Sequence, residues 1–127
     1  MTYERAKIIT SLMLVEGMTD EALGSFLDYF GDSIFDDPKK TTEELAFLKN
    51  EYPEIEVPEP FQMDVLIVKA DAVIGKARSK GIEVRDPDPS DPSQAGAVYC
   101  FAYGDCACEK TVPVRTISDF RKYRDLI

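Results

Sequence analysis

The sequence of 127 residues contains no histidine. Histidine is the side chain whose unperturbed pKa lies closest to neutral pH, so its absence removes Ser-His-Asp and Cys-His arrangements and the most frequent general base. A cysteine nucleophile needs a lysine or a helix terminus to lower its pKa, and the residues around the cysteines suggest neither. We therefore expect a protein that is not an enzyme. A cysteine-dependent enzyme remains the alternative that these residues favour least.

Cysteine is also scarce: the sequence has only Cys100, Cys106 and Cys108. A C-x-C pair with a third cysteine nearby is a conceivable zinc site, but no histidine is present as a fourth ligand. A two-residue turn at Gly104-Asp105 pairs Phe101 with Cys108, which puts Cys100 on the opposite face of the hairpin from the other two cysteines. We expect no metal, no cofactor, and reduced cysteines in a cytoplasmic protein.

Long apolar runs are absent, and none approaches the roughly 20 residues that span a bilayer. Ile8–Val15 follows Arg5 and Lys7 as the core of a signal peptide would. Thr10 and Ser11 interrupt it, however, and no small-residue cleavage site follows. We predict a core helix there and no membrane partner.

Two ligand-binding patterns are incomplete. An EF-hand loop beginning at Asp86 needs a glycine at its sixth position and a glutamate at its twelfth, and these positions are Asp91 and Ala97. The stretch KADAVIG lacks the glycines of a nucleotide-binding turn. We expect a solvated, proline-stiffened loop over 86–96 and no nucleotide site.

The acidic residues are concentrated in one third of the chain. The net charge is −9, and residues 16–59 alone carry thirteen acids against three lysines, whereas residues 60–127 are balanced at ten and ten. Such a segment repels phosphates and attracts basic surfaces. We therefore expect no direct binding of nucleic acid. All charged residues of the predicted helix Asp20–Asp36 are acids, which excludes it as a DNA-recognition helix.

The sequence predicts helices in the first half of the chain. Periodicity predicts a helix over Tyr3–Glu16 and a second one that Thr19 caps. Thr41-Thr42-Glu43-Glu44 fits a capping box that opens a third helix, Thr42–Tyr52. Pro53 and Pro58 then predict an extended connector over Glu51–Glu59.

The stretch Phe61–Lys80 predicts one long helix, which begins after Pro60 and ends at Gly81. Its apolar residues fall on two arcs: a broad one with Met63, Leu66, Ile67, Ala70, Val73, Ile74 and Ala77, and a narrow one with Phe61, Val65, Val68 and Ala72. A helix that is apolar on two sides should be covered on two sides. We therefore expect this helix to be central.

The second half predicts strands and a last helix. Ile82–Arg85 fits a short strand, and Ala97–Tyr103 with Cys106–Val114 fits an antiparallel hairpin. Thr116 fits the N-cap of a helix over Ile117–Leu126. The predicted fold is a single α+β domain over 1–127, with N-terminal helices around a central helix (about 61–80), a late antiparallel hairpin and a C-terminal helix.

The acidic segment also contains aromatic residues, which are frequent anchors of protein interfaces. We predict a non-enzymatic acidic binding protein that inhibits or neutralises a basic partner, such as a nuclease or a nucleic-acid-binding protein, in the manner of an immunity protein or a DNA mimic. One alternative is a subunit that acts by homo-oligomerisation, and another is an acidic surface that only keeps the protein soluble. The predicted contact residues are Asp28, Tyr29, Asp32, Phe35, Asp36, Asp37, Glu51, Tyr52, Glu54 and Glu56.

Overall fold

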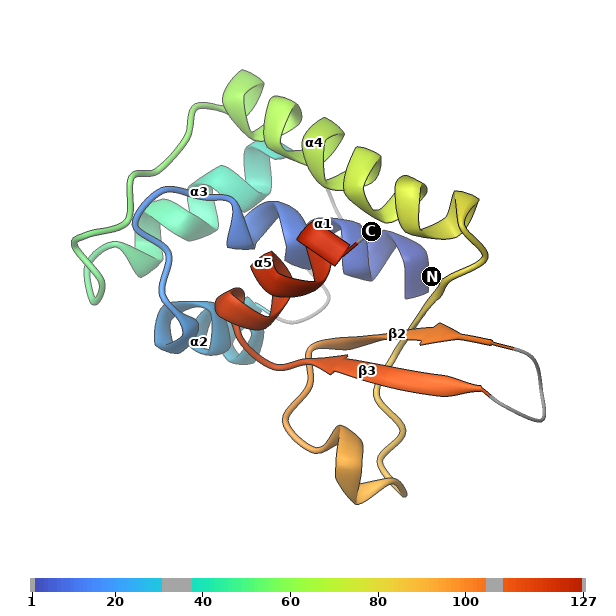
Figure 1. Ribbon diagram of the computed structural model, residues 1–127. Helices are drawn as coiled ribbons and strands as arrows, with labels where there is room; N and C mark the ends of the chain where they lie inside the picture. The colour runs from blue at the N-terminus through green and yellow to red at the C-terminus, as the bar shows by residue number, and fades with distance from the viewer. Residues whose placement is uncertain (1, 31–37, 105–108, 127) are drawn as a thin grey trace. The chain divides into compact units, whose positions relative to one another are not determined.

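The computed structural model describes residues 2–30, 38–104 and 109–126 (Figure 1). Over these residues it has five α-helices and a three-stranded antiparallel sheet, which confirms the predicted α+β class. The chain forms two compact units: Lys7–Ala70, and Met1–Ala6 together with Asp71–Ile127. The first carries fourteen acids and five lysines, and the second ten acids and ten bases. We call them the acidic unit and the neutral unit. The prediction of a single domain stays a prediction.

Helix α1 (Thr2–Met13) ends three residues before the predicted Glu16. The amide of Val15 donates to the carbonyl of Leu12 at 3.2 Å, a tightening of the last turn that is common at helix ends. Ile9–Met13 are all buried, which confirms a core helix. The hydroxyl of Ser11 is satisfied within the helix because it donates to the carbonyl of Ile8 at 2.6 Å.

Helix α2 (Asp20–Phe30) begins as predicted, since the amide of Ala22 donates to Oγ1 of Thr19 at 3.1 Å. Helix α3 (Pro38–Leu48) begins four residues before the predicted start. Thr41 is buried inside the helix and is not its cap. Pro38 explains the difference, because proline is preorganised for the first helical position. Leu45 and Leu48 are buried.

Helix α4 (Pro60–Ser79) confirms the predicted long helix. At its start, the amide of Glu59 donates to Oε1 of Gln62 at 2.9 Å. At its end, the amide of Ile82 donates to the carbonyl of Ala77 at 3.0 Å. Gly81 has φ +80°, which completes a Schellman motif.

Only one of the two apolar arcs of α4 is covered. Met63, Ala70, Ile74 and Ala77 of the broad arc are buried. The expected cover of the narrow arc is wrong, because Phe61 is 67%, Val65 49% and Val68 67% exposed. Projection on a helix shows which residues share a side, but it contains no information on what lies against that side.

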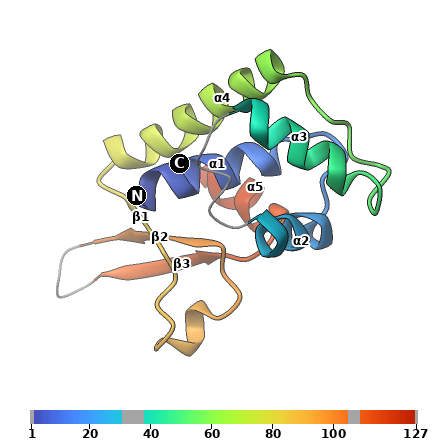
Figure 2. The ribbon, with the colours of Figure 1, turned by 180° about the vertical axis from the view of Figure 1, so that it is seen from behind.

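The neutral unit contains the sheet, in the order β1-β2-β3 (Figures 1 and 2). Strand β1 (Glu83–Arg85) confirms the predicted short strand, and β2 (Tyr99–Tyr103) lies between it and β3 (Lys110–Val114). Tyr99–Ala102 are buried, as expected for a central strand.

The predicted register of the hairpin is wrong. Phe101 pairs with Val112 and not with Cys108, and Tyr99 pairs with Val114. This register puts valines opposite buried aromatic residues, whereas the predicted one would put them opposite Ala95 and Ala97. It also keeps Pro113 in an edge strand, where a missing N–H is tolerated. Cys106 and Cys108 lie outside the described residues.

Helix α5 (Ile117–Leu126) confirms the predicted last helix. The amide of Asp119 donates to Oγ1 of Thr116 at 3.0 Å, and Oδ2 of Asp119 accepts from the amide of Arg115 at 3.0 Å. These two bonds satisfy amides that the helix itself leaves unpaired. Phe120 is buried.

Candidate protein-binding surface

All ten predicted contact residues belong to the acidic unit. Asp32, Phe35, Asp36 and Asp37 lie outside the described residues. The other six lie on α2 and on the chain that follows α3. Five of these are exposed and Tyr52 is half-buried: Asp28, Tyr29, Glu51, Tyr52, Glu54 and Glu56.

Tyr52 joins the chain after α3 to α2. Its hydroxyl lies 2.8 Å from Oγ of Ser25, one helical turn before Tyr29. The sequence alone assigned Tyr52 to the partner, but its hydroxyl already has a structural contact. This contact ties the chain after α3 to α2, and the predicted partner contact of Tyr52 stays a prediction.

Gly17 fixes the course of the connector. A Cβ atom at position 17 would lie 1.9 Å from the carbonyl oxygen of Glu54, and Gly17 has φ +82°. The amide of Glu56 donates to the carbonyl of Glu16 at 2.9 Å. These contacts place Glu16, Glu54 and Glu56, which are all exposed, on neighbouring stretches of backbone.

An aromatic cluster connects α2 to α3. The ring of Phe30 lies 5.0 Å from that of Phe26, 6.3 Å from that of Tyr29 and 6.0 Å from that of Phe47. Tyr29 and Phe47 are 57% and 61% exposed. Large exposed rings beside acidic residues fit the anchors of a protein interface.

Phe47 was missed by the sequence reasoning. A signal for it exists, because Phe47 lies about 100° around α3 from Leu48 and about 200° from Leu45, both buried. It therefore points away from the apolar side of its helix. Glu43, one turn earlier on the same side, is exposed too.

A groove of about 340 Å³ lies in the acidic unit. Three short stretches line it: the start of the turn after α1, the connector, and the first turns of α4. Its walls are mainly apolar, and its two acidic residues are Glu16 and Glu56. The lining residues are Leu14, Val15, Glu16, Glu56, Val57, Pro58, Gln62, Val65 and Leu66.

The bases of the acidic unit are all lysines: Lys7, Lys39, Lys40, Lys49 and Lys69. Lys49 is held within the unit, since its Nζ donates to the carbonyl of Ile55 at 2.6 Å. All six arginines of the chain belong to the neutral unit. The acidic unit therefore contains no guanidinium, the group that binds a carboxylate with two parallel hydrogen bonds.

A second hollow, of about 540 Å³, lies in the neutral unit. Phe101, Tyr103 and Val112 line it from one face of the sheet, and Tyr123 from α5. Among the described residues that line it, Lys80 is the only charged one. The wall of the hollow is largely apolar.

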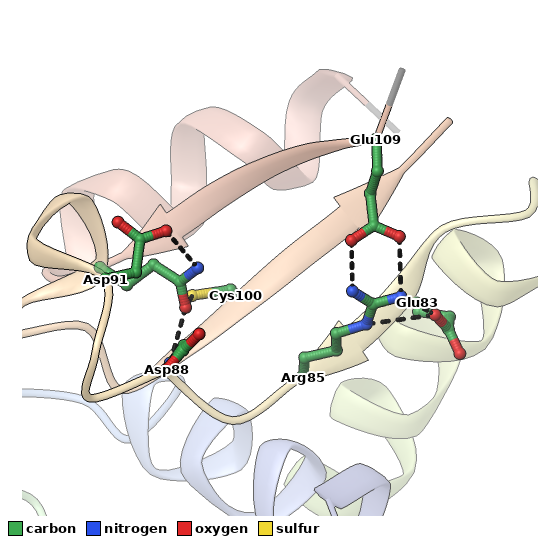
Figure 3. Close-up of polar contacts among 7 residues, drawn as sticks. Glu83, Arg85, Asp88, Asp91, Cys100 and Glu109 are labelled. Carbon is green, nitrogen blue, oxygen red and sulfur yellow. Dashed lines mark hydrogen bonds and ion pairs between the residues drawn. The ribbon is translucent and has the colours of Figure 1, made fainter. Parts of the chain in front are cut away.

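The loop 86–96 is ordered by side-chain hydrogen bonds, which the sequence reasoning did not predict. Residues Pro92–Gln94 form a short 3-10 helix, η2. Gln94 is 9% exposed: its Oε1 accepts from the amide of Asp88 at 2.7 Å, and its Nε2 donates to Asp91 at 3.0 Å (Figure 3). Hydrogen bonds from Ser90 hold the pKa of Asp88 below its usual range, and those from Ser93 do the same for Asp91.

Cys100 lies beneath this loop. Its Sγ is 3.6 Å from Oε1 of Gln94, its side chain is buried, and burial raises the pKa of its thiol. A raised pKa makes a thiol a poorer nucleophile at neutral pH. Cys100 is therefore a packed residue of the strand. Among the described residues, no group of three or more His, Cys, Asp or Glu side chains is placed to hold a metal ion.

An ion pair connects the two edge strands of the sheet. Both terminal nitrogens of Arg85, on β1, donate to Glu109, next to β3, one of them at 2.9 Å (Figure 3). Hydrogen bonds from Arg85 hold the pKa of Glu109 below its usual range. Arg85 also contacts Glu83 on its own strand. These acids of the neutral unit are thus engaged within the protein.

No family model, curated protein or solved structure matches the chain. None of the helices in the described part of the chain is long and apolar enough to cross a membrane.

Proposed function

We propose that the protein is a non-enzymatic binding protein whose acidic unit covers a basic surface of another protein and thereby inhibits or neutralises it. A nuclease or another nucleic-acid-binding protein has such a surface, and an immunity protein or an anti-defence DNA mimic acts in this way. The observation that carries the proposal is the distribution of charge. The acidic unit accounts for the whole net charge of −9, since the neutral unit has ten acids and ten bases.

Charge and aromatic residues have separate parts in this proposal. A surface of one sign accelerates the encounter with a surface of the opposite sign, and salt weakens the effect. Affinity requires anchors that become fully desolvated. Tyr29 and Phe47, the two exposed rings of the aromatic cluster, supply these anchors. Asp28 precedes Tyr29 on α2, and Glu43 lies one turn before Phe47 on α3.

The test is a comparison of two double charge reversals. Asp28→Lys with Glu54→Lys changes two exposed acids of the acidic unit. Glu83→Lys with Asp125→Lys changes two exposed acids of the neutral unit by the same total charge. Partners captured by the immobilised wild-type protein are identified by mass spectrometry, and the affinity of the purified partner is then measured for each variant.

We expect the first pair to weaken binding about 100-fold or more, because like charges facing each other cost several kcal/mol. The second pair should change the affinity less than about threefold, since exposed ion pairs contribute little. Raising the salt concentration should weaken the wild-type complex. Equal losses for both pairs, or a captured partner that is itself acidic, would contradict the proposal.

A second candidate function is a subunit that assembles with copies of itself. The exposed stripe Phe61, Val65 and Val68 on α4 favours it, because contiguous apolar surface often marks an interface. Light scattering decides between the two functions. A molar mass that rises with concentration, and that Val68→Ser lowers to the mass of the monomer, supports assembly. A constant monomer mass of 14.3 kDa excludes it.

A further inference from the structure

The groove in the acidic unit combines apolar walls with two carboxylates. We propose that it binds a basic amphipathic segment of a protein partner, in which an apolar residue is followed by an arginine or a lysine. The apolar side chain packs against the walls, and the cationic head lies between Glu16 and Glu56. This inference rests on the proposed function and identifies where, and by which chemistry, the partner is anchored.

The backbone brings the two carboxylates together. The amide of Glu56 donates to the carbonyl of Glu16 at 2.9 Å, so the two side chains leave neighbouring points of the backbone. Both residues are exposed and both line the groove. Two like charges on adjacent residues repel each other, and a guanidinium or ammonium group between them replaces the repulsion with two attractions.

The walls explain why the ligand is not a simple cation. Val57, Leu66 and Val65 line the groove, and Val65 is 49% exposed to water. Lysine and arginine carry aliphatic stems that cover such surface while their heads stay near the carboxylates. The apolar surface continues beyond the groove along α4, where Phe61 and Val68 are each 67% exposed. A segment longer than one residue is therefore accommodated.

The occupant must come from outside the acidic unit if it is an arginine, because that unit has none. The rim also excludes several other ligands. A phosphate or an acidic peptide would face Glu16 and Glu56, and a purely apolar segment would leave both carboxylates partly desolvated without a partner. Charge complementarity therefore favours a basic protein segment.

The test uses small peptides and the full chain, so that it does not depend on an identified partner. Ac-Leu-Arg-NH2 is titrated into protein with labelled methyl groups, and the signals of Val57, Val65 and Leu66 are followed by NMR. Val84, in the neutral unit, is the reference. The matched peptides are Ac-Leu-Lys-NH2, Ac-Gly-Arg-NH2 and Ac-Leu-Glu-NH2.

We expect the three groove residues to shift to saturation with Ac-Leu-Arg-NH2, with a Kd in the millimolar range that is typical of so small a ligand. Ac-Leu-Lys-NH2 should bind comparably. Ac-Gly-Arg-NH2 should bind more weakly because it lacks the apolar side chain, and Ac-Leu-Glu-NH2 should bind at least about tenfold more weakly because of charge repulsion.

Two variants separate the groove from the general charge of the unit. Glu16→Gln with Glu56→Gln keeps the shape of the side chains and should weaken Ac-Leu-Arg-NH2 about fivefold or more. Asp20→Asn with Glu21→Gln removes the same charge from exposed residues of the same unit that lie outside the groove and outside the predicted contact surface, and should change the Kd less than about twofold. The main-chain bond between Glu16 and Glu56 is unaffected in either variant.

Unsaturable shifts, equal binding of Ac-Leu-Glu-NH2, or equal losses in the two variants would overturn the groove site. Shifts of Val65 with protein concentration alone would show that a second copy is the occupant and would also overturn it. These failures are distinguishable from a failure of the proposed function. The peptide titration involves no partner, and the capture experiment reverses Asp28 and Glu54, which do not line the groove.

Discussion

The two units of the chain contain similar numbers of residues but differ in net charge and in the contacts of their charged side chains. The acidic unit has fourteen acids and five lysines, and the neutral unit has ten acids, four lysines and all six arginines. In the neutral unit, charged side chains stabilise the fold. In the acidic unit, exposed carboxylates accompany exposed aromatic rings and an open groove.

Four arginines of the neutral unit contact other residues of that unit. Arg85 pairs with Glu109 across the sheet, Arg5 donates to the carbonyl of Val98 at 2.7 Å, and Arg115 donates to the carbonyl of Ala95 at 2.8 Å. Arg78 stacks over the ring of Tyr3, with its guanidinium carbon 4.5 Å from the ring centre. A guanidinium is thus used where this protein stabilises its own fold, and under the proposed function the partner supplies one to the acidic unit.

The largest effect on the free energy of unfolding is expected from a substitution at Gly17, in the acidic unit. Gly17→Ala puts a Cβ atom against the backbone of Glu54 and forces alanine to adopt a positive φ. We expect the free energy of unfolding to fall by about 3 kcal/mol, because neither backbone can move without losing the bond between Glu16 and Glu56. Urea denaturation measures the change.

Gly24→Ala is the matched control in the same unit. Gly24 lies within α2, and apart from its chain neighbours and the backbone of its own helix no described atom lies within 4 Å of the position of its Cβ. Alanine is the better helix former, so we expect a gain of about 0.5 to 1 kcal/mol. If Gly17→Ala is as harmless as Gly24→Ala, the close approach of the connector to the end of α1 is wrong.

A smaller effect is expected in the neutral unit, at Gln94. Gln94→Ala leaves the amide of Asp88 without its acceptor and Cys100 without its cover. We expect a loss of about 1 to 2 kcal/mol in the free energy of unfolding, because a part-buried donor loses its acceptor and the buried Gln94 side chain is removed. We also expect faster alkylation of Cys100, located by mass spectrometry of the digested protein.

Gln62→Ala makes the same change of side chain in the acidic unit. Gln62 is exposed and accepts one hydrogen bond, from the amide of Glu59 at 2.9 Å. Water replaces that bond, so we expect a loss below about 0.5 kcal/mol and no change in the alkylation of Cys100. Equal losses at the two positions would mean that the loop 86–96 is not held by Gln94.

The features that the sequence predicts well depend on neighbouring residues. Pro60 and Gly81 mark the ends of α4, and Thr19 and Thr116 cap α2 and α5. Each of these signals acts within one helical turn, so it is readable without knowledge of the fold. The missed start of α3 is of the same kind, because Pro38 was a local signal that the capping pattern at Thr41 obscured.

The features that the sequence does not predict depend on distant residues. The register of β2 and β3 follows from pairing Phe101 with Val112, which a two-residue turn does not reveal. The exposed arc of α4 depends on which elements lie against it. Gln94 sits in a stretch of prolines, serines and aspartates that is typical of a loop, and its buried hydrogen bonds appear only when the strand bearing Cys100 is in place.

The candidate surface divides in the same way. The sequence shows that the acidic segment contains Asp28, Glu51, Glu54 and Glu56, and in the structure all four are exposed. The sequence did not reveal that Tyr52 contacts Ser25, nor that Glu16 and Glu56 share a groove, since both depend on the fold of the connector.

The measurement that tests the central claim most directly is the relaxation of backbone amide protons by a cationic nitroxide, compared with a neutral nitroxide of the same size. A negative surface concentrates the cation near it, and salt screens the effect. The account predicts a larger ratio at Asp28, Glu51 and Glu54 than at Glu83 and Asp125, and a smaller difference at high salt. Equal ratios in the two units would contradict it.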